Sequence, residues 1–186
     1  MSRPSAEGEL KSFYQIGVIV DILDIITSRR SIRKFEERKV SEDLLEKVLE
    51  AGRWAPSGLN NQPWRFAVIR DKKIREEMSG LTHYSRVVKA ADILIAVFMD
   101  SASGYHRVKD AQSIGACMQN MLLEAHALGL GAVWLGEIIK SDVQIRQLLG
   151  LGAELELMAV MALGHPAESL GPTTRKAMKD LIVYRN

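Results

Sequence analysis

A basic cluster near the start of the chain has the chemistry of an anion site. Three arginines and a serine hydroxyl fall within five consecutive positions: Arg29, Arg30, Ser31 and Arg33. Guanidinium groups stay charged and bind oxygen atoms bidentately, so the set suits a phosphate monoester with its roughly two negative charges. A solvated helix end has the same composition, but this cluster follows an apolar segment and precedes Phe35, which favours a folded site.

A second segment is rich in amides and turn formers. Residues 56–64 read Pro-Ser-Gly-Leu-Asn-Asn-Gln-Pro-Trp. Asn and Gln carry both a donor and an acceptor, which matches the alternating edge of a uracil-like ring. An ordinary surface loop uses the same residue types. In combination with the arginine cluster, however, the segment indicates a nucleotide-like cofactor.

A third segment, residues 129–137, runs from a glycine turn through an apolar strand to Gly136 and Glu137. A glycine at the end of a strand lets the backbone approach a flat ligand closely. A plain helix-to-strand connection is the alternative interpretation.

The hydrophobic pattern predicts the elements that position these segments. Residues 1–15 lack periodicity and are expected to form a flexible tail. The uniformly apolar stretch 93–99 is expected to be a central strand. Helices and strands are mixed without strict alternation, which indicates an α+β or mixed α/β fold and not a doubly wound sheet. Helices are expected over residues 19–28, 41–55, 71–80, 108–128 and 141–150, and strands over 64–69, 93–99, 132–135, 155–163 and 181–184.

Composition narrows the class of protein. With 186 residues, one domain is the expected organisation, here over residues 16–186. A net charge of +2 is too small to indicate nucleic acid or a membrane surface. The single cysteine, Cys117, excludes an internal disulfide and fits a reducing compartment. The apolar run 16–26 is broken by Asp21 and Asp24 and is too short for a membrane span, so a cytoplasmic protein is expected.

Several familiar motifs are missing from the sequence. A dinucleotide fingerprint would need glycine at position 134, which is Trp134, and no Walker A loop or GxSxG elbow occurs. The four histidines show no metal-ligand spacing, so no metal site is expected. Cys117 lies inside a predicted apolar helix and is interpreted as a core thiol in preference to a nucleophile.

These three segments, taken in this order, resemble the nitroreductase superfamily. They are Arg-Arg-Ser-Ile-Arg-Lys-Phe at 29–35, Pro-Ser-Gly-x-Asn-x-Gln-Pro-Trp at 56–64 and the glycine-flanked strand at 129–137. The resemblance covers Asp24 to about Tyr184 and is closest to the smaller members. It implies a central mixed sheet flanked by helices, an intertwined homodimer, and FMN bound in clefts between the subunits. The apolar helix 108–128 and the segment 181–184 are then candidates for contacts with the partner, although both could pack within their own chain.

The resemblance also implies roles for individual residues. The residues expected at the phosphate, ribityl chain and pyrimidine edge are Arg29, Arg30, Ser31, Arg33 and Arg175. Those expected along the isoalloxazine ring, partly from the neighbouring subunit, are Pro56, Ser57, Gly58 and Asn60. Those expected at flavin N5 are Leu135, Gly136 and Glu137. Two positions depart from the pattern: Thr173, where many relatives have a basic residue, and Glu137, where several have glycine.

The resemblance implies an FMN-dependent oxidoreductase in which NAD(P)H reduces FMN and a nitroaromatic, quinone or similar conjugated acceptor then takes the electrons. The flavin performs the hydride chemistry, so no catalytic side chain is assigned to the hydride step. Three alternatives stay open: a specialised flavin reaction such as reductive dehalogenation or flavin fragmentation, a non-catalytic flavin-binding protein, and an anion-binding or nucleic-acid-binding module. The last lacks a recognised motif.

Overall fold

The computed structural model describes residues 21–186, so the expected tail (1–15) and the first part of the helix expected at 19–28 lie outside the described residues. The helix begins at Ile22, after Asp21 caps it by accepting a hydrogen bond from Leu23 N. The helical elements are α2 (Ile22–Ser28), α3 (Glu42–Arg53), η1 (Gly58–Asn60), α4 (Lys72–Ser79), α5 (Ser85–Ala90), α6 (Arg107–Ala127), η2 (Glu137–Ser141), α7 (Asp142–Leu149) and η3 (Met178–Asp180), where η denotes a 3-10 helix.

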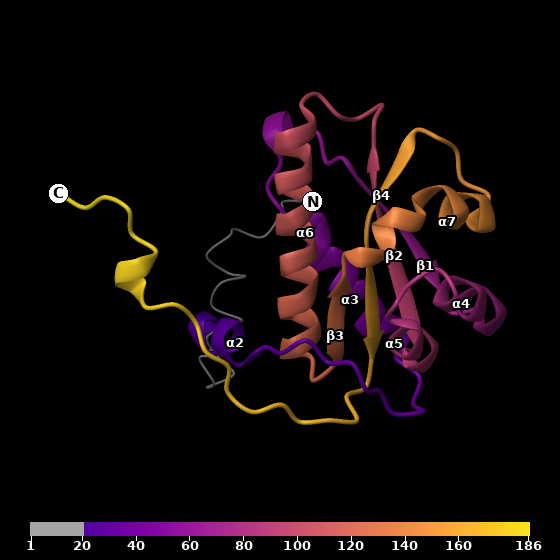
Figure 1. Ribbon diagram of the computed structural model, residues 1–186, viewed down its shortest axis with the longest axis horizontal. Helices are drawn as coiled ribbons and strands as arrows, with labels where there is room; N and C mark the ends of the chain where they lie inside the picture. The colour runs from indigo at the N-terminus through magenta and orange to yellow at the C-terminus, as the bar shows by residue number, and fades with distance from the viewer. Residues whose placement is uncertain (1–20) are drawn as a thin grey trace, which may run out of the picture.

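The strands β1 (Trp64–Ile69), β2 (Ile93–Asp100), β3 (Gly131–Leu135) and β4 (Leu155–Gly164) form one sheet in the order β1-β2-β4-β3 (Figure 1). All three pairings between them are antiparallel. Within residues 21–186, parallel pairing is limited to one isolated bridge, from Ser31 to Ala132. Every residue of β2 is buried, which confirms the prediction of a central strand at 93–99.

Helices cover both faces of the sheet (Figure 1). On one face α3 and α6 pack over a core that includes Val48, Ile95 and Met118. On the other face α4, α5, η2 and α7 pack over a second core that includes Val88, Phe98 and Ile145. The α+β class predicted from the sequence is confirmed.

The long helix α6 has the wide apolar face that its sequence predicts. Cys117 lies on that face, and burial raises the pKa of its thiol to about 12, so the thiolate is scarce at neutral pH. Gly52 of α3 packs so closely that a Cβ would come 2.7 Å from Met121 Cγ. Cys117 is therefore a core residue, as expected.

One predicted element is wrong, and one helix is not predicted by the sequence pattern. Residues 181–184 form no strand; they follow η3 on a C-terminal segment that runs away from the sheet, and Val183 and Tyr184 are exposed (Figure 1). A short strand needs a pairing edge, and the described chain brings none to it. Residues 85–90 form the helix α5, whose six residues are too few to give a clear period and whose N-terminus has no side-chain cap.

Membrane-spanning helices are missing from residues 21–186, where no helix combines the required length with sufficient apolar character.

Candidate cofactor site

The arginine cluster lies at the start of the edge strand β3. Ser31 forms a parallel bridge with Ala132, and Ile32 N donates to Ala132 O at 3.0 Å. A Cβ on Gly131 would lie 2.7 Å from Ile32 Cγ2, so glycine permits this close approach. Further along, Glu36 N donates to His165 O at 2.9 Å. The segment is thereby held between β3 and the chain that follows β4.

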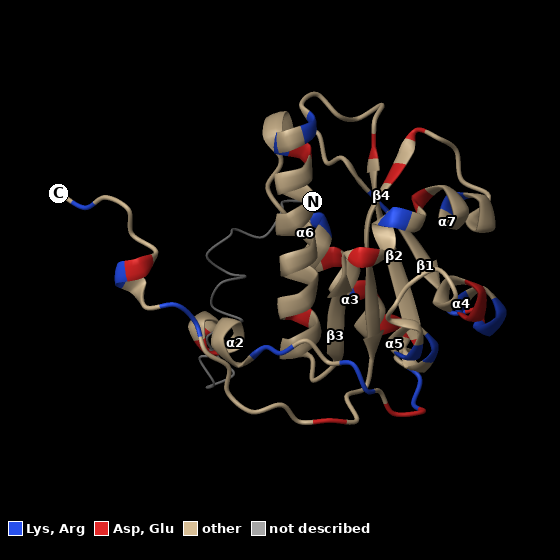
Figure 2. Ribbon diagram, in the orientation of Figure 1, with Lys and Arg blue, Asp and Glu red and all other residues tan. Residues whose placement is uncertain are grey.

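A cavity of about 420 Å³ opens beside this cluster. Figure 2 shows two basic stretches near α2, one directly after the helix and one on the C-terminal segment, and both contribute to the cavity wall. The structure therefore brings Arg175 to the cluster, where the resemblance to the nitroreductase superfamily predicts it. The described residues that line the cavity are Arg29, Arg30, Ser31, Arg33, Leu170, Gly171, Thr173 and Arg175. None of these residues carries a carboxylate side chain.

Arg29 has the least satisfied guanidinium of the cluster. Burial lowers its pKa, and the charges of Arg175 and Arg30 lower it further. Its Nε is buried without a hydrogen-bond partner among the described residues. A half-buried cation that faces other cations and has an unpaired donor favours an anion in the cavity.

Arg30 uses its donors differently from Arg29. Its Nε donates to Gly171 O at 3.0 Å, and one Nη donates to Thr27 O at 2.7 Å and to Arg29 O at 2.9 Å. These bonds tie the C-terminal segment to the end of α2. The geometry therefore gives Arg30 a positioning role in the cavity wall.

Arg33 and Arg175 are largely available to a ligand. Arg33 Nη donates to Ser31 O at 3.1 Å, and Arg175 Nη donates to Thr174 O at 2.9 Å. Neither side chain pairs with a carboxylate in the part of the chain that the structure describes. Thr173 contributes only a hydroxyl, 3.4 Å from Arg175 Nη. The positive charge of the cavity thus comes from Arg29, Arg33 and Arg175, together with Arg30, whose donors are already bonded to backbone carbonyl groups.

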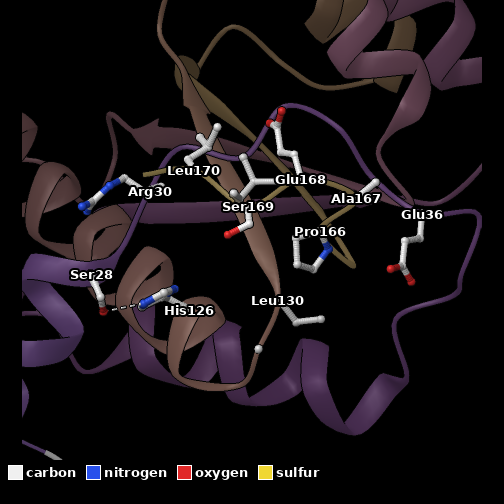
Figure 3. Close-up of a pocket in the computed structure, with 12 residues that line it drawn as sticks. Ser28, Arg30, Glu36, His126, Leu130, Pro166, Ala167, Glu168, Ser169 and Leu170 are labelled. Carbon is white, nitrogen blue, oxygen red and sulfur yellow. Dashed lines mark hydrogen bonds between the residues drawn. The ribbon is translucent and has the colours of Figure 1, made fainter. Parts of the chain in front are cut away.

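A second cavity of about 590 Å³ adjoins the first, and Arg30 lines both (Figure 3). There Ser28 Oγ and His126 Nε2 lie 2.8 Å apart. Burial lowers the pKa of His126, and Arg29 and Arg30 lower it further. His126 is not among the site residues that the sequence predicts, because no spacing in the sequence links it to residues 28–30. Only the packing of the end of α6 against α2 brings them together.

Gly136 lies at the opposite end of β3, about 13 Å from Ala132 at the usual rise of a strand. Its φ of −90° suits any residue. A Cβ there would come no closer than 3.9 Å, to Trp134 Nε1. Neither backbone conformation nor packing within the chain requires glycine here, which leaves a surface free for a ligand. The neighbouring Leu135 directs its side chain into the core, so only its backbone can face this surface.

The Glu137 carboxylate is engaged within its own chain. It forms an ion pair with Lys140 and accepts a hydrogen bond from Thr82 Oγ1 at 2.7 Å and one from His83 N at 3.2 Å. Lys140 and then Thr82 lower its pKa to about 2. Glu137 is therefore an ionised carboxylate that holds the loop between α4 and α5.

The amide-rich segment forms a strained turn around η1. Leu59, Asn60 and Gln62 have φ values of 55°, 54° and 47°, in the left-handed region that side chains disfavour. Gln62 N donates to Ser57 Oγ at 3.0 Å, and the Asn61 amide donates to Asp110 Oδ1 at 2.7 Å. Such strain persists only where surrounding contacts impose it, and it concentrates at functional sites.

In one chain this turn is far from the arginine cavity. Asn61 contacts Asp110 in the first turn of α6, whereas Ser28 contacts His126 in the last turn. The rise of ~1.5 Å per residue places these two helix positions about 24 Å apart. Pro56, Ser57, Gly58 and Asn60 therefore do not share a cavity with the arginines of their own chain.

The model of the nitroreductase family matches residues 26–86 and 80–165 of this chain. A protein of Methanothermobacter thermautotrophicus, provisionally named NADH dehydrogenase/NAD(P)H nitroreductase, is 38% identical over 154 residues, which cover 82% of this chain and 81% of that protein.

Two solved structures are also similar. A provisionally named nitroreductase from Desulfovibrio desulfuricans, crystallised in complex with FMN, is 44% identical with a TM-score of 0.86; the match covers 91% of this chain and 99% of that one. A provisionally named NADH oxidase from Clostridium acetobutylicum is 31% identical with a TM-score of 0.80, covering 88% of this chain and 100% of that one.

Proposed function

This chain belongs to the nitroreductase family, and from that membership we propose that it is an FMN-dependent oxidoreductase that uses NAD(P)H to reduce nitroaromatics, quinones or similar conjugated acceptors. It does so as a single flavin-binding domain, residues 16–186, that works in the cytoplasm as a homodimer. The similarity to a structure that contains FMN supports the choice of cofactor.

The observation that carries this proposal is the arginine cavity without a carboxylate. Arg29 offers an unpaired buried donor, and Arg33 and Arg175 add two further guanidinium groups with unengaged donors. Charged hydrogen bonds of this kind are the ones that bind phosphate strongly. The FMN phosphate fits here, with the Ser31 hydroxyl as a further donor and Arg30 bracing the wall.

The far end of the edge strand β3 offers a place for the rest of the cofactor. The Gly136 backbone would hold the ring system there, with flavin N5 the expected contact, and Glu137 shapes the adjoining loop. Leu135 contributes backbone only. The flavin, when bound, accepts hydride from NAD(P)H and passes it to the acceptor in a ping-pong cycle. Arg29 or Arg33 would be the candidate to stabilise negative charge at the pyrimidine edge of the reduced ring.

A second subunit supplies what one chain cannot. The turn at Pro56, Ser57, Gly58 and Asn60 lies at the far end of α6 from its own arginines, so it reaches a flavin bound by the partner. Exposed apolar side chains support such a dimer, because Ile22 and Trp54 are exposed and line one cavity together with Leu123 of α6. The exposed C-terminal segment 181–184 extends in a position to contact a partner.

Purification followed by absorption spectroscopy tests the proposal. The protein should be yellow, NADH or NADPH should bleach the flavin band, and menadione or nitrofurazone should restore it. A colourless protein that binds no added FMN would refute the proposal. Bleaching by dithionite alone would instead favour a specialised flavin reaction or a binding role.

A further inference from the structure

The loop between α4 and α5 is fixed to the chain that follows Gly136. At one end, Glu137 accepts hydrogen bonds from Thr82 Oγ1 and His83 N. At the other, Ser141 Oγ donates to Leu81 O at 2.8 Å. Thr82 and Ser141 are both buried, so these bonds are shielded from water. The loop therefore keeps a constant position relative to η2 and Gly136.

His83 projects from this fixed loop. Its side chain is 83% exposed, and its Nε2 lies 3.6 Å from Glu137 Oε1. One edge of the imidazole thus faces an ionised carboxylate while the other is open to solvent. The bonds from Thr82 and from the His83 backbone to Glu137 thus hold the His83 imidazole beside the residue that directly follows Gly136, the glycine at the N5 end of the proposed flavin site.

Reduction of the proposed acceptors consumes one proton in addition to the hydride. A quinone becomes a hydroquinone by gaining one hydride and one proton, and a nitro group becomes a nitroso group and water by gaining the same two. Glu137 cannot supply this proton near neutral pH, since Lys140 and Thr82 hold its pKa at about 2. Imidazole is the side chain whose ordinary titration range includes neutral pH.

The other histidines lie elsewhere. His126 contacts Ser28 beside the arginine cavity, His165 is buried after β4, and His106 directly precedes α6. Among the described histidines, His83 alone adjoins the chain after Gly136.

We propose that His83 donates the proton that accompanies hydride transfer to the acceptor, and that Glu137 is the positioning residue that holds it. The inference rests on the proposed function, because the reduced flavin is the hydride source. The imidazolium N–H bond breaks, an O–H bond forms on the reduced acceptor, and the electron pair arrives with the hydride. The neutral imidazole regains its proton from water.

Stopped-flow measurement of the two half-reactions of the FMN-loaded protein separates this role from a structural one. In His83→Ala, flavin reduction by NAD(P)H should stay within about two-fold of wild type, since that step needs no proton from the protein. Reoxidation by menadione should slow by about 10²-fold, the lower range for general acid catalysis. Added imidazole should restore most of the rate, because the exposed position leaves room for it.

Tyr84→Phe is the matched control, because it changes the next side chain of the same loop. Its reoxidation rate should stay within about two-fold of wild type, and a loss comparable to that of His83→Ala would overturn the assignment to His83. The FMN dissociation constant, read from flavin fluorescence, should be unchanged in both variants.

Glu137→Gln tests the positioning role without relying on turnover. In the apoprotein, the NMR ring resonances of His83 should shift when the carboxylate is neutralised. In the loaded protein, Glu137→Gln should slow reoxidation less than His83→Ala does, and the double variant should be no slower than His83→Ala alone. Unchanged ring resonances would remove Glu137 from the proposal.

The proposal on His83 is refuted if His83→Ala reoxidises at the wild-type rate, slows both half-reactions equally, or gains nothing from imidazole. A wild-type protein that fails to bind FMN, or whose flavin NAD(P)H does not reduce, refutes the proposed function and this inference with it. That result appears before any variant is made, so the two failures are distinguishable.

Discussion

The arginine cavity and the amide-rich turn differ in how far their own chain satisfies them. In the cavity, Arg29 Nε is a buried donor without a partner among the described residues, and the two charges that lower the Arg29 pKa, those of Arg175 and Arg30, are both positive. In the turn, Asn61 and Gln62 already donate to groups of their own chain, while three residues are held at positive φ. The cavity therefore presents positive charge without a partner among the described residues, whereas the turn has paired Asn61 and Gln62 donors, leaves Asn61 Oδ1 without a partner in the described chain, and is conformationally strained.

This difference separates two ways of building a site. An unsatisfied cluster costs stability until an anion arrives, so substitutions there should weaken binding and leave the free energy of unfolding intact. A strained turn depends on its anchors, so substitutions there should act first on stability.

Asp110→Ala should cost the most stability. The buried Asp110 carboxylate accepts hydrogen bonds from the Asn61 amide and from the backbone N–H groups of Tyr105 and His106. Leaving these donors unpaired should lower the free energy of unfolding by about 3 kcal/mol, measured by urea denaturation. The exposed Asp180→Ala is the control and should change it by less than about 0.5 kcal/mol. A loss below about 1 kcal/mol would mean that Asp110 does not anchor the turn.

Lowering the pH should weaken the same anchor, the Asp110 carboxylate. Burial works to raise the pKa of Asp110, but the hydrogen bonds from Asn61, His106 and Tyr105 outweigh it and leave the pKa lowered. The resulting stability is complete above the unfolded pKa of about 3.9 and is lost as the pH falls from there through the folded value. Asp110→Asn should lose part of this acid dependence in pH-dependent urea unfolding; an identical pH profile would contradict it.

Arg29→Ala should have the next largest effect, and it should weaken FMN binding without lowering the stability of the apoprotein. Loss of a charged hydrogen bond of about 1.5–3 kcal/mol should weaken FMN binding by roughly 10- to 100-fold, measured by fluorescence titration. Because Arg29 faces other cations, the apoprotein should melt at the same temperature or higher. Arg33→Ala should change affinity in the same direction, whereas the exposed Arg38→Ala should not. Wild-type affinity in Arg29→Ala would remove it from the phosphate site.

Leu59→Gly should relieve strain in the turn. A side chain in the left-handed region costs about 1–2 kcal/mol, and the flexibility of unfolded glycine offsets about 0.5–1 kcal/mol of the gain. The net stabilisation should be about 0.5–1 kcal/mol. Asn60→Gly should gain less, since Asn tolerates this conformation better. A destabilised Leu59→Gly would show that the 86%-exposed leucine makes contacts that matter to the apoprotein.

Gly136→Val should have the smallest effect on the apoprotein. The nearest atom to a Cβ at this position is 3.9 Å away, so the melting temperature should barely change, while crowding at the proposed ring should impair FMN binding or hydride transfer. Gly131→Ala is the contrasting control, because its Cβ would lie 2.7 Å from Ile32 Cγ2 and should destabilise the fold. Full activity in Gly136→Val would exclude Gly136 from the site.

Local sequence determined much of the fold. The uniformly apolar run at 93–99 predicts a central strand, and β2 is buried on both sides. Ser41 predicts a helix start, and its side chain accepts a hydrogen bond from Leu44 N. Gly129 and Gly150 predict helix ends, and both adopt positive φ. These signals depend on neighbouring residues only, through side-chain periodicity and capping.

Capping also shows where local rules stop. Ser141 precedes α7 as predicted, but its hydroxyl donates to Leu81 O instead of capping the helix. Residues 181–184 have strand-forming side chains, yet the described chain offers them no edge to pair with. In both cases the outcome depends on which distant backbone groups lie within reach.

The residue types alone determined that this chain carries an arginine cluster with the charge to suit an anion and an amide-rich turn, because charge and hydrogen-bonding capacity belong to the side chains themselves. Only the tertiary structure decided how they are used. Packing of the C-terminal segment against α2 brings Arg175 to Arg29 and commits Arg30 to carbonyl groups. The length of α6 separates the turn from the cavity. The contact of η2 with the loop before α5 lets Glu137 accept a hydrogen bond from His83 N and so hold His83 in place. Each of these depends on contacts between residues far apart in the chain, which no local pattern specifies.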